Sequence, residues 1–249
     1  MILPISMNTA QKRVFYGYLF CLIFIASAVR AQPLPAELKI LFIGNSYTYG
    51  NDLPELLAQL LTGKGMKVQY ESVTVGGATL EKHWLDGKAK EAIHKQQWDY
   101  VVLQEQSTRP FSHRDAFFQY AKLFSEEIKA AKAKPLFYMT WAAKANPDEQ
   151  PKLAESYRAI AKETGSVVAP VGEAWKQAVL VGMDLYVADG RHPNLLGSYL
   201  AGCVMYQTLT GKSALELPRQ LRKDGQPRPG LSEAQAETLQ RMADETMLK

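Results

Sequence analysis

The stretch KILFIGNSYTYGNDLPELL, residues 39–57, combines a buried strand, a sharp turn and the start of a helix. Its first half is nearly all apolar, which is typical of a strand covered on both faces of a parallel sheet, and Gly44 ends that run. Asp52 followed by Glu55 has the spacing of a capping box and predicts that a helix begins there. Ser46 therefore follows the strand without a capping role, as an ordinary turn residue or as a group that meets a substrate.

Four further apolar, β-rich runs occur at residues 68–76, 98–104, 135–141 and 165–171. Apolar residues recur at helical spacing between them, for example in residues 115–132 and 151–163. Strands that alternate with helices in this way predict a parallel sheet covered by helices on both faces. We expect one α/β domain over residues 32–249, with three α/β/α layers and a parallel sheet of about five strands. The carboxyl ends of such strands carry the ligand sites.

Residues 1–31 have the pattern of a secretory signal peptide. Lys12 and Arg13 precede an apolar run over residues 14–28, and small residues follow, so that cleavage after Ala28 or Ala31 fits equally well. A permanent span needs about 20 apolar residues, which this run does not reach. We expect an exported protein, periplasmic or secreted, with no stable membrane anchor after cleavage. An uncleaved N-terminal anchor is the alternative.

The formal net charge of +4 arises largely from that leader, because three of the 29 Lys and Arg residues and none of the 25 acids lie in residues 1–31. No basic stripe interleaved with aromatic residues remains, so nucleic acid is not an expected partner. Cys203 lies among apolar residues, which predicts a buried thiol. His83, His94 and His113 lack metal-ligand spacing, so we expect surface histidines, no metal and no cofactor.

A candidate base for Ser46 lies in ADGRHPNLLGSYLAG, residues 188–202. Asp189 and His192 are three residues apart on a loop that ends at Pro193, a spacing that lets the carboxylate orient the imidazole. A hydroxyl becomes a good nucleophile only when such a base takes its proton, and an imidazole with the ordinary pKa of about 6.5 does so at neutral pH. The alternative is a turn in which Asp189 caps backbone amides and His192 is merely exposed.

Taken together, Gly44-Asn45-Ser46 and the Asp189-to-Pro193 segment resemble the SGNH (GDSL-like) hydrolase superfamily. VGGATLE at residues 75–81 looks like the second block of that family, and VVLQEQS at residues 101–107 occupies the third. The Q-x-Q-S pattern in the third block is most similar to an uncharacterised branch. The resemblance covers residues 38 to about 210 and implies a flavodoxin-like fold and metal-free ester hydrolysis by a Ser-His-Asp triad.

The resemblance also implies an oxyanion hole made by the backbone N–H groups of Ser46 and Gly77 and by the side-chain amide of Gln106. Gln106 stands where the family usually has asparagine and is one methylene longer, and loss of one such donor costs about 10²–10³ in turnover. Gln104 is the alternative residue facing the site. Asn45 stands where most members have aspartate.

Several side chains beside these blocks are candidates for substrate binding: Asn45, Tyr47, Gln104, Arg109 and Trp141. Tyr47 and Tyr49 flank the serine and could stack on a sugar ring, whereas core packing is as good an account of Trp141 and a solvated charge of Arg109. Glu105 is expected to accept hydrogen bonds from loop amides rather than to act as an acid.

We expect an exported serine esterase that acts through an acyl-enzyme on a small-molecule or glycan ester, with O-acetyl on a carbohydrate as the favoured substrate. A lipid esterase or lysophospholipase is the second hypothesis. A catalytically silent glycan-binding protein on the same scaffold is the third, since fold alone does not fix function.

Overall fold

The computed structural model describes residues 37–228 and 230–247, so the predicted signal peptide lies outside the described residues. Its main sheet is parallel, with strand order β2-β1-β3-β4-β5. The strands are β1 (Glu37–Gly44), β2 (Lys67–Thr74), β3 (Tyr100–Leu103), β4 (Lys134–Tyr138) and β5 (Val167–Ala169). All five predicted strands are confirmed, with ends that differ from the sequence pattern by a few residues.

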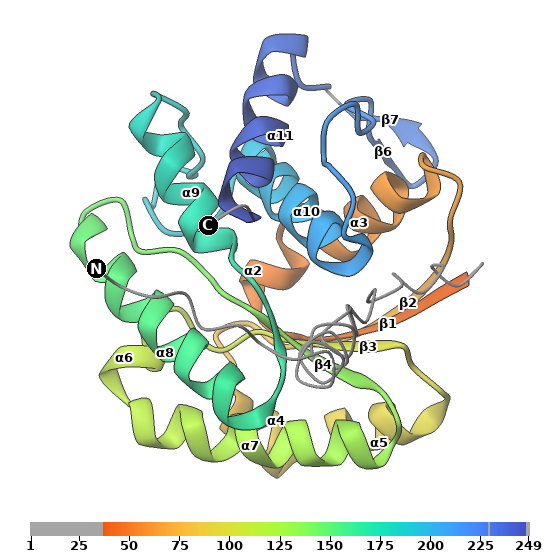
Figure 1. Ribbon diagram of the computed structural model, residues 1–249, viewed down its shortest axis with the longest axis vertical. Coiled ribbons are helices and arrows are strands. Elements are labelled where there is room, and N and C mark those ends of the chain that lie inside the picture. Colours follow the sequence, from red (N-terminus) through yellow and green to blue (C-terminus); the bar gives the residue numbers. More distant parts are fainter. Residues whose placement is uncertain (1–36, 229, 248–249) are drawn as a thin grey trace, which may run out of the picture. The chain divides into compact units, whose positions relative to one another are not determined.

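Helices cover both faces of this sheet, which makes the predicted three-layer α/β/α arrangement (Figure 1). One layer contains α3 (Leu53–Thr62), α9 (Val171–Leu180), α10 (Leu195–Thr210) and α11 (Glu233–Met247). The opposite layer contains α4 (Leu80–Asp86), α5 (Lys88–Lys95), α7 (Arg114–Ala130) and α8 (Gln150–Thr164). Two short helices, α2 (Ser46–Tyr49) and α6 (Arg109–Ser112), and two 3₁₀ turns, η1 (Gly50–Asp52) and η2 (Pro147–Glu149), follow strand ends or precede longer helices.

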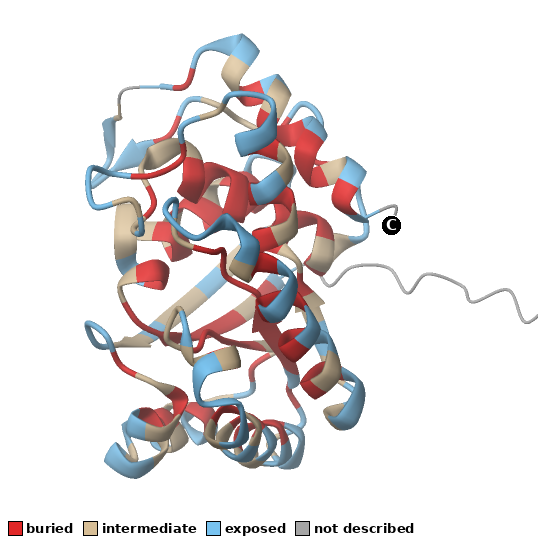
Figure 2. Cartoon of the chain, turned by 90° about the vertical axis from the view of Figure 1, so that its left-hand side faces the viewer, coloured by how far each residue is buried: buried red, intermediate tan, exposed pale blue. Residues whose placement is uncertain are grey.

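The central strand β1 explains why both faces must be covered. Ile40 and Phe42 pack into the core beneath α3 and α10, while Leu41 and Ile43 pack into the core beneath α5 and α7. Burial of each such side chain stabilises the fold by roughly 1.5–3 kcal/mol. The buried segments accordingly concentrate between the layers in Figure 2. Cys203 is buried in α10, as predicted, and burial raises the pKa of its thiol.

A capping box forms at the start of α11 but not at the start of α3. At α11, the Ser232 N–H donates to Gln235 Oε1 at 3.0 Å and the Gln235 N–H donates to Ser232 Oγ at 3.2 Å. At α3, the helix begins directly after Asp52 as predicted, but the predicted capping box is wrong: Asp52 has a φ of 58° and its side chain caps no amide. The chain enters α3 through a left-handed kink, and Glu55 instead accepts a hydrogen bond from the Tyr70 hydroxyl.

The prediction of surface histidines is confirmed for two of the three. His94 and His113 are exposed, but the prediction is wrong for His83, which is buried with Nε2 2.8 Å from the Gly44 carbonyl oxygen. The polar segment after α10 forms a small hairpin of β6 (Arg222–Lys223) and β7 (Gln226–Pro227). Among the helices that the structure describes, none has the length and apolar character needed to span a membrane.

Candidate active site

Ser46 is the first residue of α2, directly beyond the end of β1. Asn45 caps this helix: its Oδ1 accepts the Tyr47 N–H at 3.1 Å, and its Nδ2 donates to the Ala78 carbonyl at 2.9 Å. Asn45 thus uses the acceptor and the donor of its amide at once, which an aspartate carboxylate cannot do. At Gly44, a Cβ atom would lie 2.5 Å from Thr48 Oγ1, so the tight turn requires glycine.

The loop that carries His192 is tied down by backbone pairing. Tyr186 and Pro193 form an antiparallel bridge, and the Val187 N–H donates to the His192 carbonyl at 3.0 Å. From the loop after β4, the Trp141 indole N–H donates to the Arg191 carbonyl at 2.9 Å. These contacts fix the backbone on both sides of the imidazole.

Three side chains from the two segments form a continuous hydrogen-bond chain. Ser46 Oγ lies 2.9 Å from His192 Nε2, and His192 Nδ1 lies 2.5 Å from Asp189 Oδ2. The other carboxylate oxygen, Oδ1, accepts the backbone N–H groups of Arg191 at 2.8 Å and His192 at 2.9 Å. The His192 hydrogen bond and then these two amides lower the pKa of Asp189 to about 2, so the carboxylate is ionised at neutral pH.

Asn51, which the sequence did not single out, connects the serine turn to the histidine loop. Its Nδ2 donates to the Pro193 carbonyl and to Ser198 Oγ, both at 2.9 Å. Its φ of 51° lies in the left-handed region that asparagine tolerates better than most residues. In the sequence, the Asn-Asp pair after Gly50 indicates a left-handed turn. It does not indicate the hydrogen bonds from Asn51 to Pro193 and Ser198, which lie 142 and 147 residues further along the chain.

The proposed oxyanion donors lie at the ends of β1, β2 and β3. Gly77 has a φ of +66° and open space where a Cβ would stand. Within the part of the chain that the structure describes, the backbone N–H groups of Ser46 and Gly77 have no hydrogen-bond acceptor. The Gln106 side chain accepts the Thr108 N–H at 3.1 Å, while its Nε2 donates to Ser107 Oγ at 3.1 Å and keeps a second N–H.

Gln104, the alternative to Gln106, has no exposed surface. Its Oε1 accepts the Asn45 N–H at 2.9 Å and the Thr48 hydroxyl at 2.8 Å, and its Nε2 donates to the Glu105 carbonyl at 2.6 Å. The Gln104 side chain therefore binds the turn that carries Ser46 to the backbone of the third block. Its oxygen and nitrogen both have partners within the protein.

Aromatic rings buttress the histidine loop. Tyr47 stacks on Trp141 with ring centroids 4.8 Å apart, and Trp141 stacks on Trp175 with centroids 3.7 Å apart. The Tyr47 and His192 rings meet in a T-shaped arrangement with centroids 5.3 Å apart. Trp141 is 1% exposed with both faces covered, so its ring offers no stacking surface. Tyr47 is also buried, which raises the pKa of its phenol to about 12, whereas Tyr49 is 50% exposed.

The third block contains a buried acid. Glu105 is 1% exposed, and its Oε1 accepts the backbone N–H groups of Gln106 at 2.6 Å and Leu80 at 3.3 Å, so the prediction that it binds loop amides is confirmed. Burial raises the pKa of Glu105 to about 7, against the effect of these amides and of Arg109. Arg109 itself is not a freely solvated charge, because it pairs with Glu81 at the start of α4.

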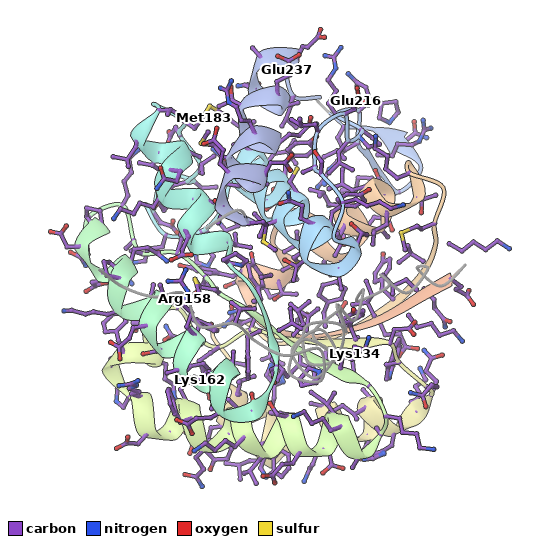
Figure 3. The ribbon with its side chains drawn as sticks, in the orientation of Figure 1. Lys134, Arg158, Lys162, Met183, Glu216 and Glu237 are labelled. Carbon is purple, nitrogen blue, oxygen red and sulfur yellow. The ribbon has the colours of Figure 1, made fainter. Side chains whose placement is uncertain are left out.

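A small cavity of about 70 Å³ adjoins the serine and histidine segments. Its polar and charged lining comes from Tyr47, Ser107, Thr108, Asn146, Glu149 and Arg191. A wider cleft of about 640 Å³ lies between α8 and α9, where Arg158 and Lys162 are labelled in Figure 3, and none of the candidate site residues lines it. Among the residues that the structure describes, no three His, Cys, Asp or Glu side chains gather as a metal site.

No protein-family model and no curated protein sequence matches the chain. Among solved structures, a protein from Slackia heliotrinireducens assigned as an SGNH hydrolase is 32% identical, with a TM-score of 0.59 over 70% of this chain and 99% of that one. A DUF4886 family protein from Bacteroides uniformis has a TM-score of 0.68 at 19% identity, over 85% of this chain and 95% of that one.

A third similar structure is a catalytic mutant of an acetylxylan esterase from Geobacillus stearothermophilus, with a TM-score of 0.57 at 15% identity over 69% of this chain and 94% of that one. The two structures below 25% identity establish a shared fold. The 32% identity to the Slackia protein, across nearly all of its length, establishes the family. The chain belongs to the SGNH (GDSL-like) hydrolase superfamily.

Proposed function

We propose that the protein is an exported serine esterase that removes a small acyl group, O-acetyl on a carbohydrate, through a Ser46-His192-Asp189 triad. The observation that carries this proposal is the uninterrupted hydrogen-bond chain of 2.9 and 2.5 Å from the hydroxyl through the imidazole to the carboxylate. That chain has the connectivity that nucleophilic catalysis by serine requires.

The reaction proceeds in two acyl transfers. His192 Nε2 takes the Ser46 proton as Oγ forms a bond to the ester carbonyl carbon, and Asp189 stabilises the resulting imidazolium. The carbonyl C–O bond to the sugar then breaks, and His192 returns the proton to the departing alcohol oxygen. Water, activated in turn by His192, attacks the acyl-enzyme and releases the carboxylic acid and free Ser46.

The negative charge on the carbonyl oxygen needs donors that are in place before the reaction. The backbone N–H groups of Ser46 and Gly77 are assigned this role, together with the free N–H of the Gln106 amide. Support comes from the absence of a competing acceptor for the two backbone groups among the described residues. The fixed carboxamide of Gln106, held through its oxygen at the start of α6, is consistent with a preorganised donor.

Two features favour a carbohydrate acetate over a lipid ester. The cavity of about 70 Å³ is lined by Tyr47 and Arg191, the chain neighbours of Ser46 and His192, and by Ser107, Asn146 and Glu149, so it suits hydroxyl-rich or short groups rather than a long acyl chain. The ring of Tyr49 is half exposed near Gly76, where it is free to pack against a sugar. The acetylxylan esterase from Geobacillus stearothermophilus shares this fold.

The decisive experiment compares the chain from residue 32 onward with its Ser46→Ala variant on p-nitrophenyl acetate, butyrate and octanoate. We expect acetate to be the best substrate and the variant to lose at least about 10³-fold in kcat. Release of acetate from acetylated xylan would extend the result to glycans. A preference for octanoate would favour the lipid esterase. Glycan binding without hydrolysis in either protein would favour the silent binding protein.

A further inference from the structure

We propose that Glu105 is a positioning residue for the oxyanion hole, and that it acts by tying the second and third sequence blocks together. This inference rests on the proposed function of Gly77 and Gln106 as oxyanion donors. It concerns a side chain that takes no part in the acyl transfer itself. Its role follows from the two backbone amides that meet at its carboxyl group.

The first contact is to the third block. Glu105 Oε1 lies 2.6 Å from the backbone nitrogen of Gln106, so the carboxyl group folds over its own chain and accepts that N–H. The Gln106 side chain is then held at its other end, since its Oε1 accepts the backbone N–H groups of Thr108 at 3.1 Å and Arg109 at 3.3 Å. Backbone and carboxamide of Gln106 are therefore fixed together.

The second contact is to the second block. The backbone N–H of Leu80, the first residue of α4, points at both carboxyl oxygens of Glu105, at 3.3 and 3.4 Å. Gly77 lies three residues before Leu80, and the intervening Ala78 carbonyl is held by Asn45 Nδ2 at 2.9 Å. One buried carboxyl group thus links the start of α4, and the Gly77 turn that precedes it, to the backbone of Gln106.

Charged and titratable groups from three elements surround this link. Arg109 of α6 faces Glu105 and pairs with Glu81 of α4, so this ion pair ties α4 to α6 a second time. The buried Tyr157 hydroxyl of α8 lies near the backbone of Glu105. Glu105 is 1% exposed, so a change in its length or acceptor capacity must be taken up by the two amides that it holds.

The test compares Glu105→Ala and Glu105→Gln with the wild type. Alanine removes both acceptors, whereas glutamine keeps one oxygen where Oε1 stands. We expect Glu105→Ala to lower kcat about 10- to 100-fold with KM changed less than about threefold, because only transition-state stabilisation is lost. We expect Glu105→Gln to retain kcat within about threefold. Glu163→Gln, which breaks an exposed pair with Lys122, is the matched control.

Amide hydrogen exchange tests the same link without any substrate. In Glu105→Ala we expect faster exchange in residues 77–82 and 104–109 together, with residues 134–138 of β4 unchanged. Glu105→Asp is the second variant: its shorter carboxylate reaches only one amide, so exchange should rise in one of the two segments. Wild-type kcat in Glu105→Ala, or exchange that rises in neither segment, would overturn the proposal. If the wild type hydrolyses no ester, the proposed function fails, while the exchange result still decides whether Glu105 links the two blocks.

Discussion

Asp189 and Glu105 serve the two halves of the candidate site, and their surroundings have opposite effects on a carboxyl group. Asp189 is exposed and accepts hydrogen bonds from His192 and two backbone amides, which lower its pKa to about 2. Glu105 also accepts two backbone amides, but burial dominates and raises its pKa to about 7.

The difference shows how each half achieves its geometry. The triad half is held by an ionised carboxylate in contact with water, on a loop that is pinned by the Tyr186–Pro193 bridge and the Trp141 indole. The oxyanion half is held by a carboxyl group inside the protein, next to the core. A perturbation of the first half should change chemistry with little change in stability, whereas loss of the buried carboxyl group in the second half should change both.

Asp189→Asn is expected to give the largest effect of the variants that separate the two halves. An amide nitrogen facing His192 Nδ1 favours the wrong tautomer, so kcat on p-nitrophenyl acetate should fall about 10³- to 10⁴-fold. Because Asp189 is exposed, the melting temperature should change by no more than about 2 °C. A loss of less than tenfold, in a variant that folds normally, would mean that the carboxylate is not the orienting group.

Gln106→Glu probes the oxyanion half with the next largest effect. The carboxylate oxygens still accept the Thr108 and Arg109 amides at the start of α6, but the donor is replaced by negative charge. We expect kcat to fall about 10²- to 10³-fold with the melting temperature nearly unchanged. The control is Gln106→Ala, which loses the donor and the cap and should also melt earlier. Full activity of Gln106→Glu would remove Gln106 from the oxyanion hole.

The sequence allowed the fold and the triad segments to be predicted because both depend on local patterns. The five strands follow from apolar runs, and Asp189 reaches His192 across three residues within one loop. The 2.9 Å contact between Ser46 and His192 spans 146 residues, and it was expected from the parallel sheet and the family resemblance rather than from spacing.

The second half of the site was less predictable, because its residues act through long-range contacts that have no sequence signal. Gln104 binds the Asn45 amide across 59 residues, and Glu105 binds Leu80 across 25. Q-E-Q-S alone therefore left open which glutamine faces the site. Trp141 was equally ambiguous, since a tryptophan at a strand end suits a ligand platform or a buried stack. Asp52 differs from the prediction because the backbone before α3 is left-handed. His83 differs because α4 packs on the end of β1, which buries the imidazole.

The pH dependence of stability provides the last and smallest test, and it isolates Glu105. Its pKa is about 7 in the folded protein against an ordinary 4.5, so between these values the native state keeps a proton that the unfolded chain has lost. Wild-type stability from this group therefore falls as the pH rises from about 4.5 to 7 and is level above that. Glu105→Gln does not titrate, so its stability relative to the wild type should increase as the pH rises through that window. The expected increase is at most about 3 kcal/mol in the free energy of unfolding, or several degrees in melting temperature.

Thermal melts at pH 5, 6, 7 and 8 measure this difference, and Glu163→Gln on the surface should show no such change with pH. Curves for Glu105→Gln and wild type that stay parallel from pH 5 to 8 would show that the carboxyl group is ionised throughout, and the contrast with Asp189 would disappear.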